Sequence, residues 1–305
     1  MAKLSDALPP LKTRLRMALR EDLALRGDVT SQALVPPEKK ADGVFLAKAD
    51  GVLCGVQLLA PLFAAAAELA GNKERVQVKI LKKDGAPVQR GDQVAVVKGS
   101  ARTLLAGERT ALNLLCHLSG VATQTRRYVS LVAHTRAKIL DTRKTLPLWR
   151  DLQKYAVECG GAVNHRFGLH DMILIKDNHL ALWGAQDPAG AVNAARKKFP
   201  KLPIEVEVVE LAGLKHVCEH ASPEFVLLDN FKVPELRAAV EWCHGFFSRG
   251  NRKKARRPLL EASGGITLEN LSAIAETGVD RISVGALTHS VGALDLSLEL
   301  NFLRV

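Results

Sequence analysis

The spacing of hydrophobic residues divides the chain into two parts. Up to about residue 100, short alternating runs lie between Gly and Asp turns, which indicates mixed strands and helices. Beyond residue 137, short apolar runs alternate with amphipathic segments, which is typical of βαβ units around a parallel sheet. The predicted strands of the first part are 43–49, 76–81 and 93–98. Those of the second part are 137–140, 172–175, 204–208, 225–228, 259–262 and 281–284.

Helices are predicted where apolar residues recur every three or four positions. The first 22 residues indicate an amphipathic surface helix, and two more helices are expected over 101–115 and 120–132. The most apolar stretch, 52–70, is interrupted by polar residues, glycine and proline. It therefore predicts a packing helix, because a membrane span needs about 20 apolar residues. Between the later strands, helices are predicted over 147–159, 188–199, 211–220, 234–247 and 268–277.

The number of strand–helix units limits the choice of fold. Six units favour a closed or nearly closed barrel over a simple open sheet, but they fall short of the eight in the standard β/α barrel. We therefore predict an α/β fold with an incomplete, six- to seven-stranded β/α barrel.

Composition narrows the function classes. The 305 residues are 47% hydrophobic and 25% charged, which excludes intrinsic disorder, collagen-like repeats and a membrane bundle. Lys and Arg number 43 against 32 Asp and Glu, and the net charge of +11 favours anionic partners. The five cysteines are scattered and form no C-x-x-C, which argues against a disulfide framework or a structural zinc site. A reducing, cytoplasmic setting is therefore expected.

Polar residues or glycine follow every predicted strand of the second part. In β/α barrels the C-terminal ends of the strands form the rim that carries the active site. Loop chemistry and helix capping would explain the Asp and Ser residues. They do not explain Lys176 directly after an apolar strand, or Arg143 and Lys144 after the first one. The segments concerned are 141–144, 176–179, 207, 229–230, 263–265 and 285–286.

Two glycine segments follow the last two strands. Ser263-Gly264-Gly265 and Gly285-Ala286 let a phosphate approach the backbone, and the first is predicted to lead into a helix with free N–H groups. Turns need glycine in any case, so one such segment alone is weak evidence. Two on consecutive strand ends resemble the phosphate sites of barrels.

Charged residues gather on the same predicted rim. Arginine offers a planar fork for carboxylate or phosphate, and lysine a compact point charge. A solvated basic face would also explain any single member, but the whole set needs anions to offset its repulsion. Glu207 and Asp229 would suit Mg²⁺, or would neutralise the cations. The cations are Arg109, Arg143, Lys144, His165, Arg166 and Lys176.

Three other features are discounted. His216, Cys218 and His220 lack a further metal ligand and are expected at the surface. No G-x-S-x-G or ordered Ser/His/Asp set supports hydrolase chemistry. The basic run 249–257 lies between a predicted helix and a strand and is expected to be a solvated loop. No aromatic residues are interleaved with it, so its signal for nucleic acid is weak.

Longer motifs place the chain among known proteins. It closely resembles the quinolinate phosphoribosyltransferase family, also called carboxylating nicotinate-nucleotide pyrophosphorylases, over almost its whole length. The basic stretch 248–257 looks longer than is usual in that family. The matching segments are 21–22 (ED), 27–30 (GDVT), 107–113 (GERTALN), 141–145 (DTRKT), 164–169 (NHRFGL), 174–179 (LIKDNH), 205–207 (EVE), 227–231 (LLDNF), 261–266 (EASGGI) and 284–288 (VGALT).

The resemblance implies a fold, an assembly and a reaction. An N-terminal α/β sandwich domain over 1–117 would be completed by 290–305, and a barrel domain would occupy 118–289. The chain would form at least a homodimer, with a hexamer left open, and each site would be built from two chains. Quinolinate and phosphoribosyl pyrophosphate would give nicotinate mononucleotide, pyrophosphate and CO₂ with Mg²⁺, a step of NAD synthesis.

The resemblance also implies residue roles. Arg143, His165, Arg166 and Lys176 would hold the quinolinate carboxylates, together with Arg109 donated by the partner subunit. Lys144, Glu207 and Asp229 would meet phosphoribosyl pyrophosphate and its Mg²⁺, and catalysis would rest on Lys144, Lys176, Glu207 and Asp229. The 5′-phosphate would lie at Ser263, Gly264, Gly265, Gly285, Ala286 and His289.

Three other functions compete with this interpretation. A related phosphoribosyltransferase could act on a different acidic ring, but the full cation set suits two carboxylates. A basic nucleic-acid-binding protein would show salt-sensitive binding without substrate. An inactive scaffold is disfavoured by the intact rim. No nucleic-acid or membrane partner is expected.

Overall fold

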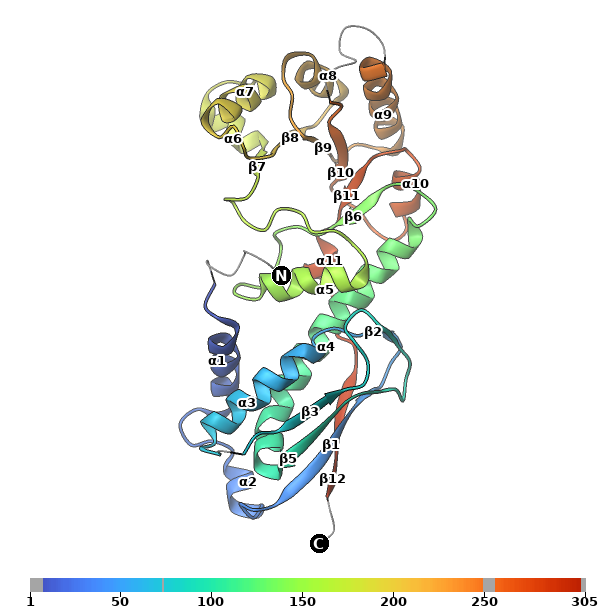
Figure 1. Ribbon diagram of the computed structural model, residues 1–305. Helices are drawn as coiled ribbons and strands as arrows, with labels where there is room; N and C mark the ends of the chain where they lie inside the picture. Colours follow the sequence, from blue (N-terminus) through green and yellow to red (C-terminus); the bar gives the residue numbers. More distant parts are fainter. Residues whose placement is uncertain (1–7, 73, 249–255, 303–305) are drawn as a thin grey trace. The chain divides into compact units, whose positions relative to one another are not determined.

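The computed structural model describes residues 8–72, 74–248 and 256–302, which form two compact units (Figure 1). The first unit comprises Met1–Arg126, Leu146–Gly161 and Val291–Val305. The second comprises Arg127–Thr145 and Ala162–Ser290. Residues 146–161 thus group with the first unit, although they lie in sequence between two strands of the second.

An antiparallel sheet forms the centre of the first unit. Its strands are β12 (Leu296–Phe302), β1 (Lys40–Ala47), β5 (Gln93–Ser100) and β3 (Gln77–Ile80), in that order. The C-terminal strand β12 pairs with β1 along its length, so the end of the chain completes the N-terminal sheet. A short second pair joins β2 (Gly51–Val52) to β4 (Pro87–Val88).

Helices cover this sheet and enclose the core. They are α1 (Leu11–Leu23), α2 (Val29–Leu34), the 3₁₀ turn η2 (Val56–Leu58), α3 (Leu59–Leu69), most of α4 (Ala101–Leu131) and α5 (Arg150–Gly160). Leu15 and Leu19 of α1, Phe45 of β1 and Phe63 of α3 are fully buried in one cluster. The mixed α/β character expected of the N-terminal domain is confirmed.

The predicted N-terminal helix and the apolar stretch 52–70 both pack as expected. α1 buries Leu15 and Leu19 and exposes Lys12, whereas residues 1–7 of that prediction lie outside the described part of the chain. Most of the apolar stretch is η2 and α3, which pack in the core. Within the described residues, no helix has both the length and the hydropathy that crossing a bilayer requires.

The prediction of two helices over 101–115 and 120–132 is wrong, because α4 runs through Gly120 without a break. A Cβ atom on Gly120 would lie 2.3 Å from the carbonyl oxygen of Gly292. The glycine therefore allows close backbone approach, and it does not end the helix.

Six parallel strands form the sheet of the second unit. They are β6 (Lys138–Leu140), β7 (Ile173–Ile175), β8 (Ile204–Val208), β9 (Phe225–Asp229), β10 (Leu259–Ser263) and β11 (Arg281–Ser283). Their order is β6-β11-β10-β9-β8-β7, and Leu140 of β6 also bridges Val163 in parallel. All six predicted strands are confirmed, and the sheet is the expected incomplete barrel.

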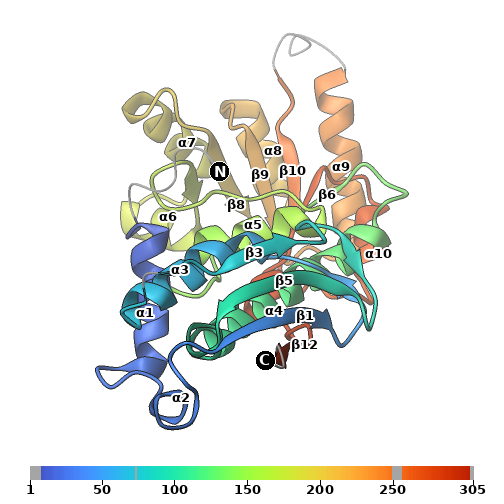
Figure 2. The ribbon, with the colours of Figure 1, turned by 60° about the horizontal axis from the view of Figure 1, so that its bottom comes forward.

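Helices connect these strands. They are α6 (Asp177–Trp183), α7 (Pro188–Lys198), α8 (Leu211–His220), α9 (Val233–Ser248), α10 (Leu271–Ala275) and α11 (Ala286–His289). Figure 2 shows α7, α8 and α9 beside the strands that they connect. The predictions missed α6 and α11, as well as α2, β2 and β4. The helix predicted from residue 268 begins at 271, so a turn separates Gly265 from α10.

Register determines which side chains share a face of the parallel sheet. Leu174 lies opposite Glu205, and Ser263 lies opposite Asp229. Because side chains alternate along a strand, residues two apart share a face. One face therefore carries charged and hydroxyl side chains from five neighbouring strands, at three levels. Glu205 lies at the first level. The second level holds Lys176, Glu207, Glu261 and Arg281, and the third holds Asp229, Ser263 and Ser283.

The close approach at Gly120 predicts a stability difference between two helical glycines. Gly120→Ala should lower the free energy of unfolding by about 1–3 kcal/mol, because the added methyl group meets the Gly292 backbone. Gly245→Ala in α9 is the matched control, since a Cβ atom there meets nothing within 4 Å. It should raise stability by about 1 kcal/mol through helix propensity. Equal urea midpoints for the two variants would contradict the packing assigned to Gly120.

Candidate active site

The ends of β7 and β8 bring a lysine and a carboxylate together. Lys176 Nζ lies 2.6 Å from Glu207 Oε2. Its backbone N–H donates to His179 Nδ1 at 3.0 Å, which fixes the start of α6. The Lys176 side chain is 44% exposed and that of Glu207 only 8%, so the ammonium group can meet a ligand while it neutralises the buried acid.

The ends of β9 and β10 are joined closely. The N–H of Asn230 donates to the Ser263 carbonyl at 2.9 Å, and its side-chain amide donates to Asp229 Oδ2 at 2.8 Å. Gly264 has φ +92°, and a Cβ atom on it would lie 2.1 Å from Asn230 Oδ1. The glycine is therefore required for this approach, whereas a Cβ atom on the next residue, Gly265, would meet nothing within 4 Å.

The ends of β6 and β11 form a second glycine-containing cluster. Thr288 Oγ1 donates to the carbonyl oxygen of Lys144 at 2.8 Å. A Cβ atom on Gly285 would lie 3.0 Å from both Lys144 Cδ and His289 Nε2. Ala286 begins α11 directly after this glycine. The structure thus brings Lys144, which follows β6, together with Gly285, Ala286 and His289, which follow β11. β11 lies next to β10, the strand that ends at Ser263.

Two arginines of the second unit lie close enough to repel each other. Burial lowers the pKa of Arg166, and the positive charge of Arg143 lowers it further. Arg166 Nη1 donates to the Met172 carbonyl at 3.1 Å, whereas Arg143 Nε is buried and has no hydrogen-bond partner in the described structure. Buried donors are normally paired, so Arg143 Nε is an exception among the described residues.

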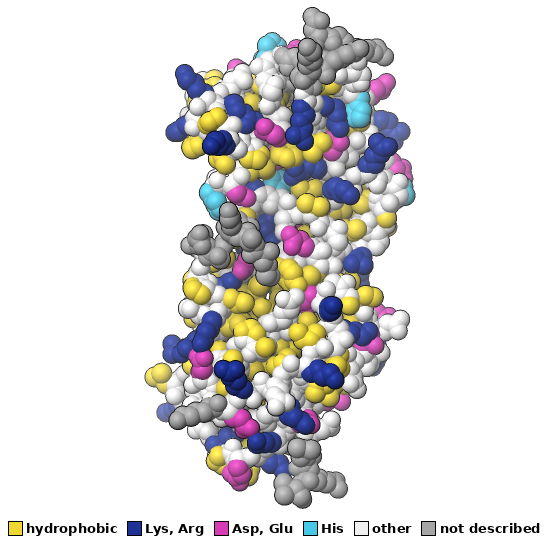
Figure 3. All heavy atoms as spheres, in the orientation of Figure 1, with side chains coloured by type: hydrophobic (Ala, Val, Ile, Leu, Met, Phe, Trp, Pro, Cys, Tyr) yellow, Lys and Arg dark blue, Asp and Glu magenta, His cyan; other side chains and the backbone are white. Residues whose placement is uncertain are grey.

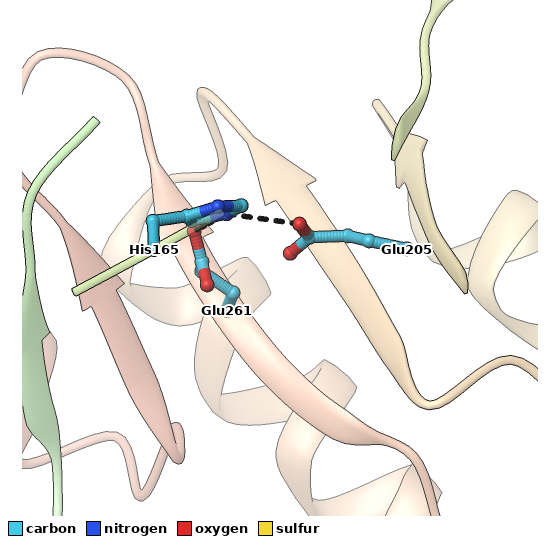
Figure 4. A group of neighbouring side chains, drawn as sticks. All are labelled: His165, Glu205 and Glu261. Atoms are coloured by element: carbon cyan, nitrogen blue, oxygen red, sulfur yellow. Dashed lines mark ion pairs between the residues drawn. The ribbon is translucent and has the colours of Figure 1, made fainter. Parts of the chain in front are cut away.

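Figure 4 shows a buried cluster of His165, Glu205 and Glu261. His165 Nε2 lies 2.9 Å from Glu205 Oε2 on β8 and 3.4 Å from Glu261 Oε1 on β10. Both carboxylate side chains are fully buried, and the His165 side chain is 7% exposed. Arg281 Nε lies 2.8 Å from Glu261 Oε2, and its guanidinium stacks 4.1 Å from the centre of the Phe225 ring. Carboxylates from β8 and β10 reach one imidazole, so these side chains converge on one face of the sheet.

The surroundings of the two acids act on them differently. Burial raises the pKa of Glu205, and the neighbouring charge of Glu261 raises it further. Burial alone would also raise the pKa of Glu261. Its contacts with His165 and Arg281 outweigh this, and its pKa is lowered. The pKa shifts of the two acids therefore run in opposite directions, and Arg281 pairs with Glu261 as its cation.

Two opposing influences act on His165. Burial opposes a charged ring, but the carboxylates of Glu205 and Glu261 outweigh it and raise the pKa of His165 to about 9. In the other direction, the backbone N–H of Arg166 donates to Nδ1 at 2.7 Å, which requires a lone pair on that atom. A pKa of about 9 would keep the ring charged at neutral pH, but a charged ring has no lone pair on Nδ1, so on the geometry of this contact we assign the neutral form with its proton on Nε2.

The remaining predicted residues are placed as follows. Arg109 lies on α4 in the first unit, whereas the other predicted cations lie in the second. His216 Nε2 pairs with Asp187 Oδ1 at 2.8 Å and its ring packs on His220, while Cys218 is buried. Among the described residues, the one cluster with metal-ligand geometry is His165, Glu205 and Glu261.

The basic run 249–257 falls mostly outside the described residues, which exclude 249–255. Arg257 forms a two-point ion pair with Asp280, at 2.7 and 2.8 Å. On the face drawn in Figure 3, Lys and Arg side chains lie in small separate groups in each unit.

Sequence reasoning missed Glu205, Glu261 and Arg281 as site residues. Each is a charged residue inside or at the start of a short buried strand: IEVEV, LLEAS and RIS. A charge within an apolar strand is a usable signal, because an unpaired ion is not tolerated there. Its partner cannot be read from the sequence, since it lies on another strand.

Comparisons with known proteins agree with this geometry. A family profile described as "Quinolinate phosphoribosyl transferase, C-terminal domain" matches residues 121–299, and its N-terminal counterpart matches 28–119. The chain is 45% identical to a nicotinate-nucleotide pyrophosphorylase [carboxylating] of Mycobacterium leprae, over 94% of this chain and 95% of that protein.

Solved structures are also similar. The nicotinate-nucleotide pyrophosphorylase from Francisella tularensis has a TM-score of 0.83 and 36% identity, with 95% of each chain covered. NadC from Streptococcus pyogenes has a TM-score of 0.85 and 35% identity, with 96% of each chain covered.

The contact between Gly264 and Asn230 predicts unequal effects of two neighbouring substitutions. Gly265→Ala should lower stability by about 1–2 kcal/mol, because its φ of +61° is left-handed but a Cβ atom meets nothing within 4 Å. Gly264→Ala should cost at least about 1 kcal/mol more, since the methyl group displaces Asn230 as well. Urea unfolding measures both. Equal losses would contradict the tight junction between β9 and β10.

Proposed function

The chain belongs to the quinolinate phosphoribosyltransferase family, and from that premise we propose how the strand ends of its second unit carry out the reaction. The enzyme joins quinolinate to phosphoribosyl pyrophosphate. Together with one proton, these give nicotinate mononucleotide, pyrophosphate and CO₂. This reaction belongs to NAD biosynthesis.

The arginine pair is the observation that carries the proposal. The charge of Arg143 lowers the pKa of Arg166, and Arg143 Nε is buried without a hydrogen-bond partner among the described residues. A dicarboxylate offsets both charges and supplies paired acceptors in the geometry that guanidinium groups favour. We therefore place the quinolinate carboxylates between Arg143, Arg166 and the exposed ammonium group of Lys176. His165 and Arg109, which the family pattern includes in the same set, are assigned to quinolinate binding as well, with His165 acting from the buried cluster.

The glycine clusters suit the second substrate. The backbone of Ser263, Gly264 and Gly265, which is open at Gly265, would receive the 5′-phosphate of phosphoribosyl pyrophosphate on one side. On its other side, the same phosphate would contact the cluster of Lys144, Gly285, Ala286 and His289. Lys144 would reach the polyphosphate as a point charge.

Glu207 and Asp229 fit a magnesium ion by the chemistry of their oxygen atoms. They lie on the same face of adjacent strands, at the rim where the polyphosphate would bind. Mg²⁺ prefers a few carboxylates with water and substrate oxygens, and it would neutralise charge on the departing pyrophosphate. Glu207 is held by Lys176, so it would act through water or after Lys176 turns to the substrate.

The chain's own groups then supply orientation and electrostatics. Cations on the quinolinate carboxylates hold the ring so that its nitrogen meets the anomeric carbon. The carboxylates of Glu207 and Asp229 favour the positive charge that develops on the sugar as the C–O bond to pyrophosphate breaks. The new ring cation draws electrons from the breaking bond to the 2-carboxylate, and a proton replaces CO₂. No covalent nucleophile is required.

The assembly and its setting complete the proposal. Arg109 would reach the site of the partner subunit in a homodimer, or in a hexamer built from dimers. The five cysteines are free thiols, which suits the reducing cytoplasm.

Substrate choice tests the proposed reaction directly. With Mg²⁺ and phosphoribosyl pyrophosphate, quinolinate should yield nicotinate mononucleotide and an equal amount of CO₂. Chromatography measures the nucleotide, and gas release measures the CO₂. Nicotinate should give little product, because one carboxylate leaves an arginine without its anion. Equal turnover of the two acids would contradict the role given to the arginine pair.

Loss of the rim ammonium group is a second test. Lys176→Ala should lower kcat/KM about 100-fold or more, because a charge-assisted contact to the substrate is removed and Glu207 loses its partner. Lys201→Ala, an exposed lysine in the loop before β8, is the matched control and should keep normal turnover. Circular dichroism checks that both variants fold. Near-normal kcat/KM in a folded Lys176→Ala protein would remove Lys176 from the site.

A further inference from the structure

The ring of His165 is turned toward the protein. Nε2 faces the carboxylates of Glu205 and Glu261, and Nδ1 accepts from the N–H of Arg166. The side chain is 7% exposed. Both ring nitrogens are thus directed at groups of the chain, an arrangement that suits holding a loop better than grasping a ligand.

The backbone of His165 links the same ring to a second loop. Its N–H donates to Asp141 Oδ1 at 2.7 Å, and Asp141 is fully buried at the end of β6. Arg143 follows Asp141 by two residues, and Arg166 follows His165 directly. His165 therefore connects the carboxylates of β8 and β10 to both arginine-bearing segments, through its ring to Arg166 and through its backbone N–H to Asp141.

We propose that Glu205 and Glu261 are positioning residues for quinolinate binding, acting through the His165 ring to set the places of Arg143 and Arg166. The inference rests on the proposed quinolinate site and adds to it a second layer inside the barrel. Arg281 and Phe225 hold the far side of Glu261, so that its carboxylate is fixed from both ends.

Stability alone is a poor explanation for this cluster. Taking two carboxylates out of water costs more than their ion pairs return, and well-packed apolar residues usually do as well or better. A metal ion is also a poor explanation, because Arg281 already supplies a cation 2.8 Å from Glu261. The buried carboxylates instead hold one imidazole ring in place, next to the two loops that are proposed to bind the ligand.

The experiment separates the two substrates kinetically. Glu261→Gln and Glu205→Gln keep the side-chain shape and remove the charge. Each should raise the KM for quinolinate about 10- to 100-fold, the range that outer partners of a ligand-binding histidine contribute at metal sites. The KM for phosphoribosyl pyrophosphate should change less than about twofold, since none of these residues lies in the glycine clusters.

A double-mutant cycle tests the route through the histidine. His165→Ala should raise the quinolinate KM at least as much as Glu261→Gln, and the double variant should match His165→Ala alone. Independent effects would instead multiply.

Glu224→Gln is the matched control for loss of a carboxylate in the same unit. Glu224 pairs with Arg196 at 2.6 Å and accepts from the Ile204 N–H at 2.7 Å, near the opposite ends of the strands. Its variant should lose thermal stability without any change in quinolinate KM.

The possible results separate this inference from the proposed function. Variants with normal quinolinate KM, with both KM values raised alike, or with effects that multiply in the His165→Ala background would overturn the inference alone. Failure of both glutamine variants to fold would assign the acids to stability and also overturn it. If the unchanged protein does not turn over quinolinate at all, the proposed function fails and the inference fails with it.

Discussion

The second unit depends on a constraint set by two buried acids. Glu205 and Glu261 extend from β8 and β10 into the interior of the sheet, where water cannot solvate them. A buried charge must be paired, so Arg281 lies against one carboxylate and the His165 ring against both. Because His165 lies in the segment before β7, satisfying these acids also fixes a loop at the rim. The pairing that the buried acids require thereby fixes the position of this loop.

Register decides which other groups reach that rim. Parallel strands end at the same edge, and alternation sends residues two apart to the same face. Glu205 and Glu207 therefore act at successive levels of one strand, the first inside the barrel and the second at its mouth. The same step relates Glu261 to Ser263 on β10. On β8 and on β10, a buried acid thus lies one step below a residue that is proposed to face the substrate.

Local pattern was enough to predict the strands and most of the helices, and motif resemblance supplied the residue roles. The break predicted near Gly120 failed because the glycine serves a distant backbone contact with Gly292. Short elements such as α6 and α11 were missed, since four to seven residues hold too little periodicity. The partners of Glu261 could not be foreseen either. His165 and Arg281 meet it only when β10, β11 and the loop before β7 are folded together.

The charges at the rim differ in how far they are neutralised by other groups of the chain. Lys176 is neutralised locally by Glu207, whereas Arg143 and Arg166 repel each other and Arg143 Nε lacks an acceptor among the described groups. If His165 were an imidazolium, a further positive charge would lie beside Arg166 and raise this repulsion. With Nδ1 accepting from the Arg166 backbone, the ring instead holds the loop without adding charge. Arg143 and Arg166 then carry the positive charges that the two carboxylates of the proposed ligand would offset.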